Sequence, residues 1–186
     1  MASDPGRPLS KPETLASEVQ WQGRTIRVLA ERVRIPNGNE VTLDVVRHPG
    51  ASAVVPVDAD GTVLMVRQYR HTVGDWLLEV PAGKLSPGED PAACAHRELE
   101  EEAGVRAATL RELGSIYVSP GFCDERIWLF LATELSAGQQ ALEADEALSL
   151  ERVPLAEAER RAMSGEILDA KSTCAILRAA ALLRRG

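Results

Sequence analysis

Three glutamates recur at helical spacing between residues 98 and 102. Glu98, Glu101 and Glu102 are three and four positions apart, so on a helix they share one face. The pairs Glu98–Glu101 and Glu98–Glu102 place like charges one turn apart, which costs an isolated helix about 0.2–0.5 kcal/mol each. An exposed helix tolerates that cost. The cluster by itself is therefore compatible with a solvated surface face as well as with a metal site.

The segment in front of these glutamates favours the metal site. Pro81-Ala82-Gly83 and Ser86-Pro87-Gly88 have turn composition and lead into the predicted helix. Such turns can bring backbone carbonyls beside the carboxylates, and hard oxygen ligands of both kinds suit Mg²⁺ or Mn²⁺. Magnesium usually completes its shell with water and substrate phosphates. The local chemistry therefore predicts a metal site that acts on a diphosphate.

The same stretch matches a family signature. Residues 83–105 read GKLSPGEDPAACAHRELEEEAGV. This resembles the Nudix box, G-x5-E-x7-R-E-U-x-E-E-x-G-U with U a bulky aliphatic residue, at every specified position. At average residue usage, chance would produce such a match in a chain of this length on the order of once in ten million times. The box covers 23 residues directly, and the order of predicted elements extends the resemblance over most of the chain.

The Nudix resemblance implies a fold and a set of roles. The fold would be α/β (α+β): a Nudix α/β/α sandwich with a mixed sheet between helices, preceded by an N-terminal antiparallel β ribbon. Glu98 and Glu102 would be the main metal ligands, with Glu101 close by. Arg97 would orient the glutamates by ion pairing, and the carbonyl of Ala82 would be a further ligand. Mg²⁺, or Mn²⁺ or another divalent cation, would bridge the diphosphate and activate water.

Residues outside the box resemble the ADP-ribose pyrophosphatases within this family. Pro120 lies sixteen positions after Gly104, in the run Ser-Pro-Gly-Phe-Cys-Asp-Glu. The run Val-Arg-Gln-Tyr-Arg ending at Arg70, followed by Glu-Val-Pro-Ala-Gly from Glu79, looks like the same subfamily. There the arginine contacts the substrate diphosphate, and we carry that role to Arg70. The plainer alternatives are a Pro-Gly turn and a surface arginine at a strand end.

The general base and the remaining substrate contacts are less specific. In the resembling enzymes the base often comes from an acidic loop before the last strand, which here contains Glu143 and Glu146. We favour Glu146, with Glu143 next, against the alternative of a solvated acidic loop. Arg47, beside His48, is a candidate for a substrate phosphate. Trp21 is a candidate for stacking on adenine.

The elements that must position these residues follow from local patterns. A helix over 91–103 is predicted by Asp90 as N-cap, Pro91 at the first position and Gly104 after the end. Alternation around Pro36-Asn37-Gly38-Asn39 predicts a hairpin within a β ribbon that extends from Val19 to His48. Further strands are expected at 53–57, 62–69, 77–80, 116–119, 126–132 and 148–153, and helices at roughly 155–164 and 170–184.

Composition limits the function classes. The formal net charge of −7 argues against a protein that coats nucleic acid. No run of 18 apolar residues predicts a membrane span, and the N-terminal residues lack the apolar core of a signal peptide. Three scattered cysteines fit reduced thiols, so we expect a cytoplasmic protein. We expect a flexible tail at 1–12, a β region at 13–48 and a catalytic domain at 49–186. In the resembling enzymes the N-terminal β region packs across a two-fold axis, so the resemblance implies a homodimer formed through residues 13–48.

The resemblance to the ADP-ribose pyrophosphatases implies hydrolysis of ADP-ribose to AMP and ribose 5-phosphate. Other nucleoside diphosphate sugars, such as GDP-mannose, stay open as substrates. A rival from another class is a Nudix domain that binds ADP-ribose or a nucleotide without cleaving it, but such domains commonly lose box carboxylates. A helical interaction module built on the last two helices has only an amphipathic pattern behind it.

Overall fold

The computed structural model describes residues 10–142 and 147–185, which form two compact units. The first unit holds the described residues up to His48 together with Ser119–Asp124, and the second holds Pro49–Val118 and the described residues from Glu125 onward. Of the expected N-terminal tail, residues 10–12 are described and precede the first strand, whereas residues 1–9 lie outside the described range.

The first unit is built on a three-stranded antiparallel sheet. Its strands are β1 (Glu13–Gln22), β2 (Arg27–Arg34) and β3 (Glu40–Arg47), in the order β1-β2-β3. The predicted hairpin joins β2 to β3, and Gly38 N donates to Ile35 O across the turn at 2.9 Å. The ribbon begins at Glu13, six residues before the expected start.

The second unit contains a mixed four-stranded sheet. Its strands are β4 (Ala51–Pro56), β7 (Ala82–Lys84), β8 (Val105–Tyr117) and β9 (Arg126–Ala137), in the order β7-β4-β9-β8. β4 runs parallel to β9, and the other pairs are antiparallel. Every residue of β4 is buried, which explains why this segment reads as a continuous apolar run.

A second sheet and three helices complete this unit. The sheet is antiparallel in the order β10-β5-β6, with β5 at Thr62–Arg70, β6 at Asp75–Glu79 and β10 at Leu148–Pro154. The helices are α1 (Pro91–Ala103), α2 (Leu155–Ser164) and α3 (Ala170–Leu183). All three helices lie within a residue of the bounds that the sequence predicts.

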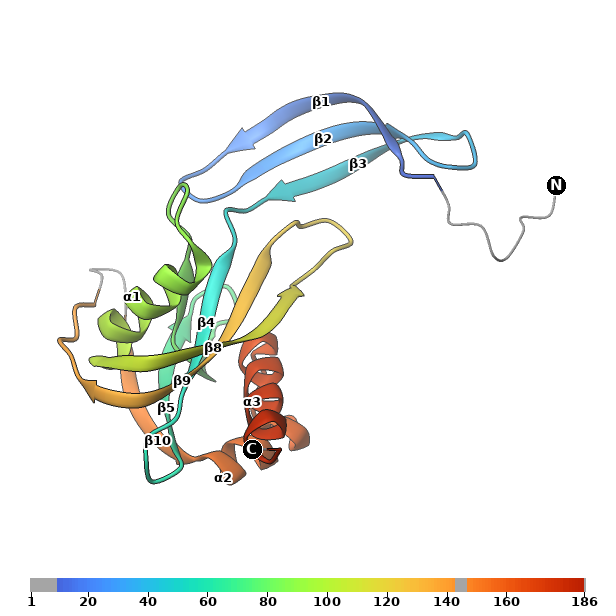
Figure 1. The fold of residues 1–186 in the computed structure, drawn as a ribbon. Helices are drawn as coiled ribbons and strands as arrows, with labels where there is room; N and C mark the ends of the chain where they lie inside the picture. Colours follow the sequence, from blue (N-terminus) through green and yellow to red (C-terminus); the bar gives the residue numbers. More distant parts are fainter. Residues whose placement is uncertain (1–9, 143–146, 186) are drawn as a thin grey trace. The chain divides into compact units, whose positions relative to one another are not determined.

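Two apolar cores on opposite faces of the mixed sheet make the fold a sandwich. Val54 packs with Leu99 and Phe130 in the core beneath α1. Its neighbours Ala53 and Val55 point to the other face, where the core includes residues of α2, α3 and the second sheet. α1 and α3 accordingly lie on opposite sides of the sheet (Figure 1). The expected α/β/α arrangement with a mixed sheet is confirmed.

Two strands of the second unit depart most from the expectation. β8 begins at Val105, eleven residues before the predicted strand. Its own sequence pattern does not predict this extension, which forms because β9 pairs with it along the whole length. β7 was not anticipated, since three residues of turn composition form a strand only by pairing with β4. Within residues 10–142 and 147–185, no helix combines the length and the hydropathy needed to cross a bilayer.

Candidate active site

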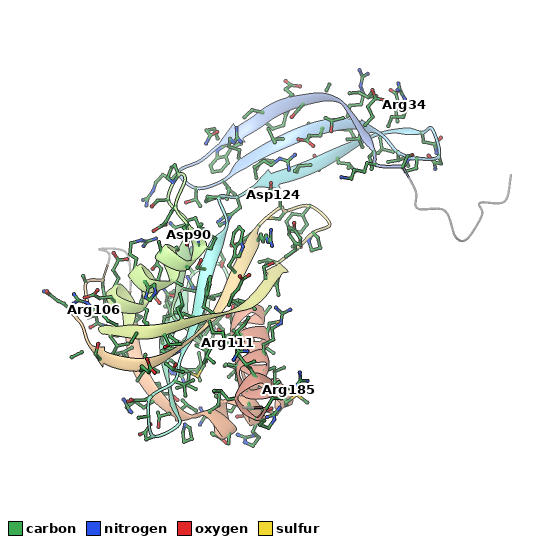
Figure 2. The ribbon with its side chains drawn as sticks, in the orientation of Figure 1. Arg34, Asp90, Arg106, Arg111, Asp124 and Arg185 are labelled. Atoms are coloured by element: carbon green, nitrogen blue, oxygen red, sulfur yellow. The ribbon has the colours of Figure 1, made fainter. Side chains whose placement is uncertain are left out.

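Both ends of α1 are capped by neighbouring residues, and these caps favour the helix at this position. Asp90 accepts hydrogen bonds from Ala92 N and Ala93 N, and Pro91 occupies the first turn. Gly104 ends the helix with φ of 66°, a left-handed conformation that glycine adopts without steric cost. Figure 2 labels Asp90 near the start of this helix.

The carboxylates of α1 are not a solvated face. Glu98 is 7% exposed and Glu102 is 2% exposed, even though both are charged and one helical turn apart. Burying a carboxylate is costly unless hydrogen bonds and cations compensate it. Because this like-charged pair is buried, the cluster is not explained as part of a solvent-exposed helix face. Glu101, by contrast, is only half-buried.

Arg97 supplies much of the compensation. Its Nη1 donates to Glu98 Oε1 at 2.6 Å and to Glu101 Oε2 at 3.0 Å, and its Nε donates to Glu89 Oε1 at 2.9 Å. The guanidinium therefore joins three of the box glutamates. The hydrogen bonds to Glu89 lower the pKa of that carboxyl to about 2, and contacts with Glu89 and Glu98 raise the pKa of Arg97.

The backbone of β7 lies directly against the buried carboxylates. A Cβ built on Gly83 would lie 1.9 Å from Glu98 Oε1, so a residue with a side chain at position 83 would displace this carboxylate. Ala82 N donates to Glu102 Oε2 at 2.9 Å. The thiol of Cys94 donates to the Gly83 carbonyl at 3.5 Å, and burial raises its pKa to about 11. Cys94 is therefore a protonated structural residue at neutral pH rather than a nucleophile.

This donor set fits a hard divalent cation. Glu98, Glu101 and Glu102 present carboxylate oxygens, and the strand that carries Ala82 lies beside two of them. Among the residues that the structure describes, no three acidic, histidine or cysteine side chains form a ready-made metal cage. A magnesium ion that takes water and substrate phosphates as ligands does not require one.

Arg70 is held by a buried carboxylate in the second unit. Its Nε and Nη2 donate to the two oxygens of Glu79 at 2.8 and 2.6 Å, a bidentate pair. Glu79 is 1% exposed and also accepts a hydrogen bond from Lys171. Burial opposes ionisation of Glu79, but the hydrogen bonds from Arg70 and the charge of Lys171 outweigh it, and the pKa of Glu79 is lowered.

The sequence did not point to Lys171 as part of this group. Lys171 and Glu79 are 92 positions apart, and Lys171 lies in the first turn of α3. The local sequence Asp-Ala-Lys-Ser marks the start of a helix, with Asp169 as its N-cap. It contains no information about which strand the helix end meets.

The other expected substrate residues lie in the first unit. Pro120 belongs to a turn in which Phe122 N and Cys123 N both donate to Ser119 O. Arg47 donates to Glu31 at 2.7 Å and to Asp124 at 3.0 Å, and these hydrogen bonds raise its pKa. The Arg47 guanidinium thus links β3 to the segment Ser119–Asp124, which contains Pro120. Contact between Arg47 and a substrate phosphate stays a prediction.

Both candidates for the general base, Glu143 and Glu146, lie outside the described residues. The next described residue is Ala147, whose carbonyl accepts a hydrogen bond from Tyr69 N at 3.4 Å. This hydrogen bond places Ala147 beside the end of β5, the strand that carries Arg70.

Comparison with known proteins agrees with this geometry. The NUDIX domain matches residues 46–172. The chain is 41% identical to the ADP-ribose pyrophosphatase of Bacillus subtilis (88% of this chain, 90% of that protein) and 41% identical to that of Mycobacterium tuberculosis (89% and 81%). A crystal structure described as an ADP compounds hydrolase shares the fold, with a TM-score of 0.84, 24% identity and coverage of 97% of this chain and 98% of that one. The box, its folded geometry and these matches together show that the chain belongs to the Nudix family.

Proposed function

We propose that this protein hydrolyses the diphosphate bond of ADP-ribose to give AMP and ribose 5-phosphate. The observation that carries the proposal is the buried pair Glu98 and Glu102 on α1, held against the backbone of β7. The two ADP-ribose pyrophosphatases that are 41% identical support the choice of substrate. Every carboxylate of the box is present, which favours an enzyme over a binding domain.

The box carboxylates would bind the metal ion. Glu98 and Glu102, with Glu101 and the Ala82 carbonyl, would hold Mg²⁺, with Mn²⁺ as an alternative. When bound, such a cation neutralises diphosphate charge and lowers the pKa of a water ligand.

Arg97 would keep Glu98 and Glu101 in ligating position through its hydrogen bonds. Arg70 would orient a phosphate oxygen of the substrate, because Glu79 fixes its guanidinium. Glu146, or Glu143, would take the proton from the attacking water. Pro120 and Arg47 are further candidates for contact with the substrate.

We also propose a homodimer formed through residues 13–48 and a cytoplasmic location. Large apolar side chains are exposed on β1 and β3, with Val19 52%, Trp21 55% and Leu43 46% exposed. Exposed apolar residues gathered on one small sheet mark an interaction surface. The three free cysteines fit a reducing compartment. Light scattering after size-exclusion chromatography that shows only monomer at micromolar concentration would reject the dimer.

The decisive experiment is a product analysis with matched variants. The protein is incubated with Mg²⁺ and ADP-ribose, GDP-mannose or NADH, and the products are separated by chromatography. Glu102→Gln removes a proposed ligand, whereas Glu100→Gln changes a half-buried glutamate of the same helix that pairs with Arg106.

We expect AMP and ribose 5-phosphate mainly from ADP-ribose, in the wild type and in Glu100→Gln but not in Glu102→Gln. Faster hydrolysis of GDP-mannose would support the diphosphate hydrolysis but reject ADP-ribose as the preferred substrate. If no substrate is hydrolysed, the remaining interpretation is a Nudix domain that binds ADP-ribose or a nucleotide without cleaving it.

A further inference from the structure

The N-terminus of α3 reaches the carboxylate that holds Arg70. Lys171 is 11% exposed at its side chain and contacts Glu79 and Asp169, the latter at 3.0 Å. Glu79 therefore pairs with two cations, Arg70 and Lys171, which both donate to its Oε2. Because Glu79 is buried, its orientation depends on these partners rather than on water.

The α3 end of this network is itself fixed. Asp169 accepts a hydrogen bond from Ser172 N at 2.9 Å and another from the Ser172 hydroxyl, so its charge lies at the positive end of the helix dipole. The Ser172 hydroxyl also accepts from Val80 N at 2.9 Å. One helix end thus holds both the Glu79 side chain and the backbone that follows it toward Ala82.

Lys171 adds a second positive charge beside the carboxylate of Glu79, which already pairs with Arg70. Without Lys171, the negative charge of Glu79 would lower the positive potential that Arg70 presents to a substrate anion. Lys171 shares the Glu79 carboxylate, while the positive end of the α3 dipole, equivalent to about half an elementary charge, offsets part of the negative charge of Asp169. Arg70 therefore keeps a positive potential for the diphosphate while its guanidinium stays fixed.

We propose that Lys171 is a positioning residue for substrate binding, acting through Glu79 on Arg70. The inference rests on the proposed function, in which Arg70 binds the diphosphate. Lys171 contacts Glu79 and Asp169, so its loss should act on the Arg70 side of the site and weaken substrate binding more than it slows the chemical step.

The test compares variants of Lys171 in two backgrounds. Lys171→Met removes the charge and the donor, Lys171→Gln removes only the charge, and Lys171→Arg keeps both. Each is made in the wild type and in Arg70→Met, and KM and kcat for ADP-ribose are measured with Mg²⁺. Arg178→Met is the matched control, because it removes one positive charge from an exposed position of the same helix.

We expect Lys171→Met and Lys171→Gln to raise KM roughly tenfold and to change kcat less than threefold, with Lys171→Arg close to the wild type. In the Arg70→Met background the same substitutions should have little further effect, because a residue that acts through Arg70 cannot act without it. Thermal melting of each variant shows that the folded protein is being assayed, and Lys171→Gln serves if Lys171→Met does not fold.

Three results would overturn the inference: an unchanged KM in Lys171→Gln, a loss confined to kcat, or effects that add fully to those of Arg70→Met. In each of these cases the wild-type enzyme still hydrolyses ADP-ribose, so the proposed function survives. A wild-type protein that hydrolyses no nucleoside diphosphate sugar would overturn both.

Discussion

Gly83→Ala would place a methyl group where the Glu98 carboxylate lies. The added Cβ would be 1.9 Å from Oε1, 2.0 Å from Cδ and 2.4 Å from Oε2 of Glu98. Ordinary contact begins at 3.4 Å, so the nearest oxygen must retreat by the difference, about 1.5 Å. The backbone at position 83 is not left-handed, so the substitution acts through this displacement alone.

The displacement should cost far more in activity than in stability. Misplacing a catalytic group by about 1 Å can cost about 100-fold, so we expect kcat/KM to fall roughly 100-fold, equivalent to about 2.7 kcal/mol. Loss of the hydrogen bond from Arg97 to Glu98 costs up to about 3 kcal/mol of stability, and alanine in place of glycine returns about 0.4–1 kcal/mol. The protein should therefore remain folded at 25 °C.

The assay follows AMP release from ADP-ribose, with Mn²⁺ affinity measured by electron paramagnetic resonance and stability by thermal melting. Gly138→Ala is the matched control, because its Cβ would meet the flexible side chain of Glu100 at 3.2 Å, outside the proposed metal site. A Gly83→Ala protein with kcat/KM within threefold of the wild type and unchanged Mn²⁺ affinity would refute the reasoning. So would an equal loss in Gly138→Ala.

Three further predictions concern α1 and the residues that contact its charged side chains. Leu99 is fully buried on the inner face of α1, so Leu99→Ala should lower the free energy of unfolding by about 2–5 kcal/mol, measured by urea denaturation. Arg97 lowers the pKa of Glu89 from 4.5 to about 2, so this ionised carboxylate stabilises the fold above about pH 4.5, and the contribution disappears as the pH falls through 2. The stability difference between the wild type and Glu89→Gln should therefore shrink from pH 5 to pH 2, and a constant difference would contradict the ion pair. Removal of divalent cations by a chelator should abolish hydrolysis and lower the melting temperature of the wild type, whereas the melting temperature of Glu102→Gln should not respond.

The helix that carries the glutamates was predictable because its signals are local. Asp90, Pro91 and Gly104 act within one turn of the backbone that they cap, so their effect does not depend on the rest of the fold. Spacing alone likewise places Glu98, Glu101 and Glu102 on one face. The long strand β8 was predicted only at its end, since its first eleven residues, rich in alanine, leucine and arginine, become a strand by pairing with β9.

The sequence by itself determined the chemistry: which side chains share a helix face, what ions such oxygens prefer, and which family carries the same spacing. Only the tertiary structure decided that Glu98 and Glu102 are buried, that β7 approaches them closely enough to require glycine, and that Lys171 reaches Glu79 across 92 positions. Spacing rules act through the covalent geometry of a single element. Burial and charge pairing depend on which distant segments pack together, and that choice is made by the whole core rather than by any local pattern.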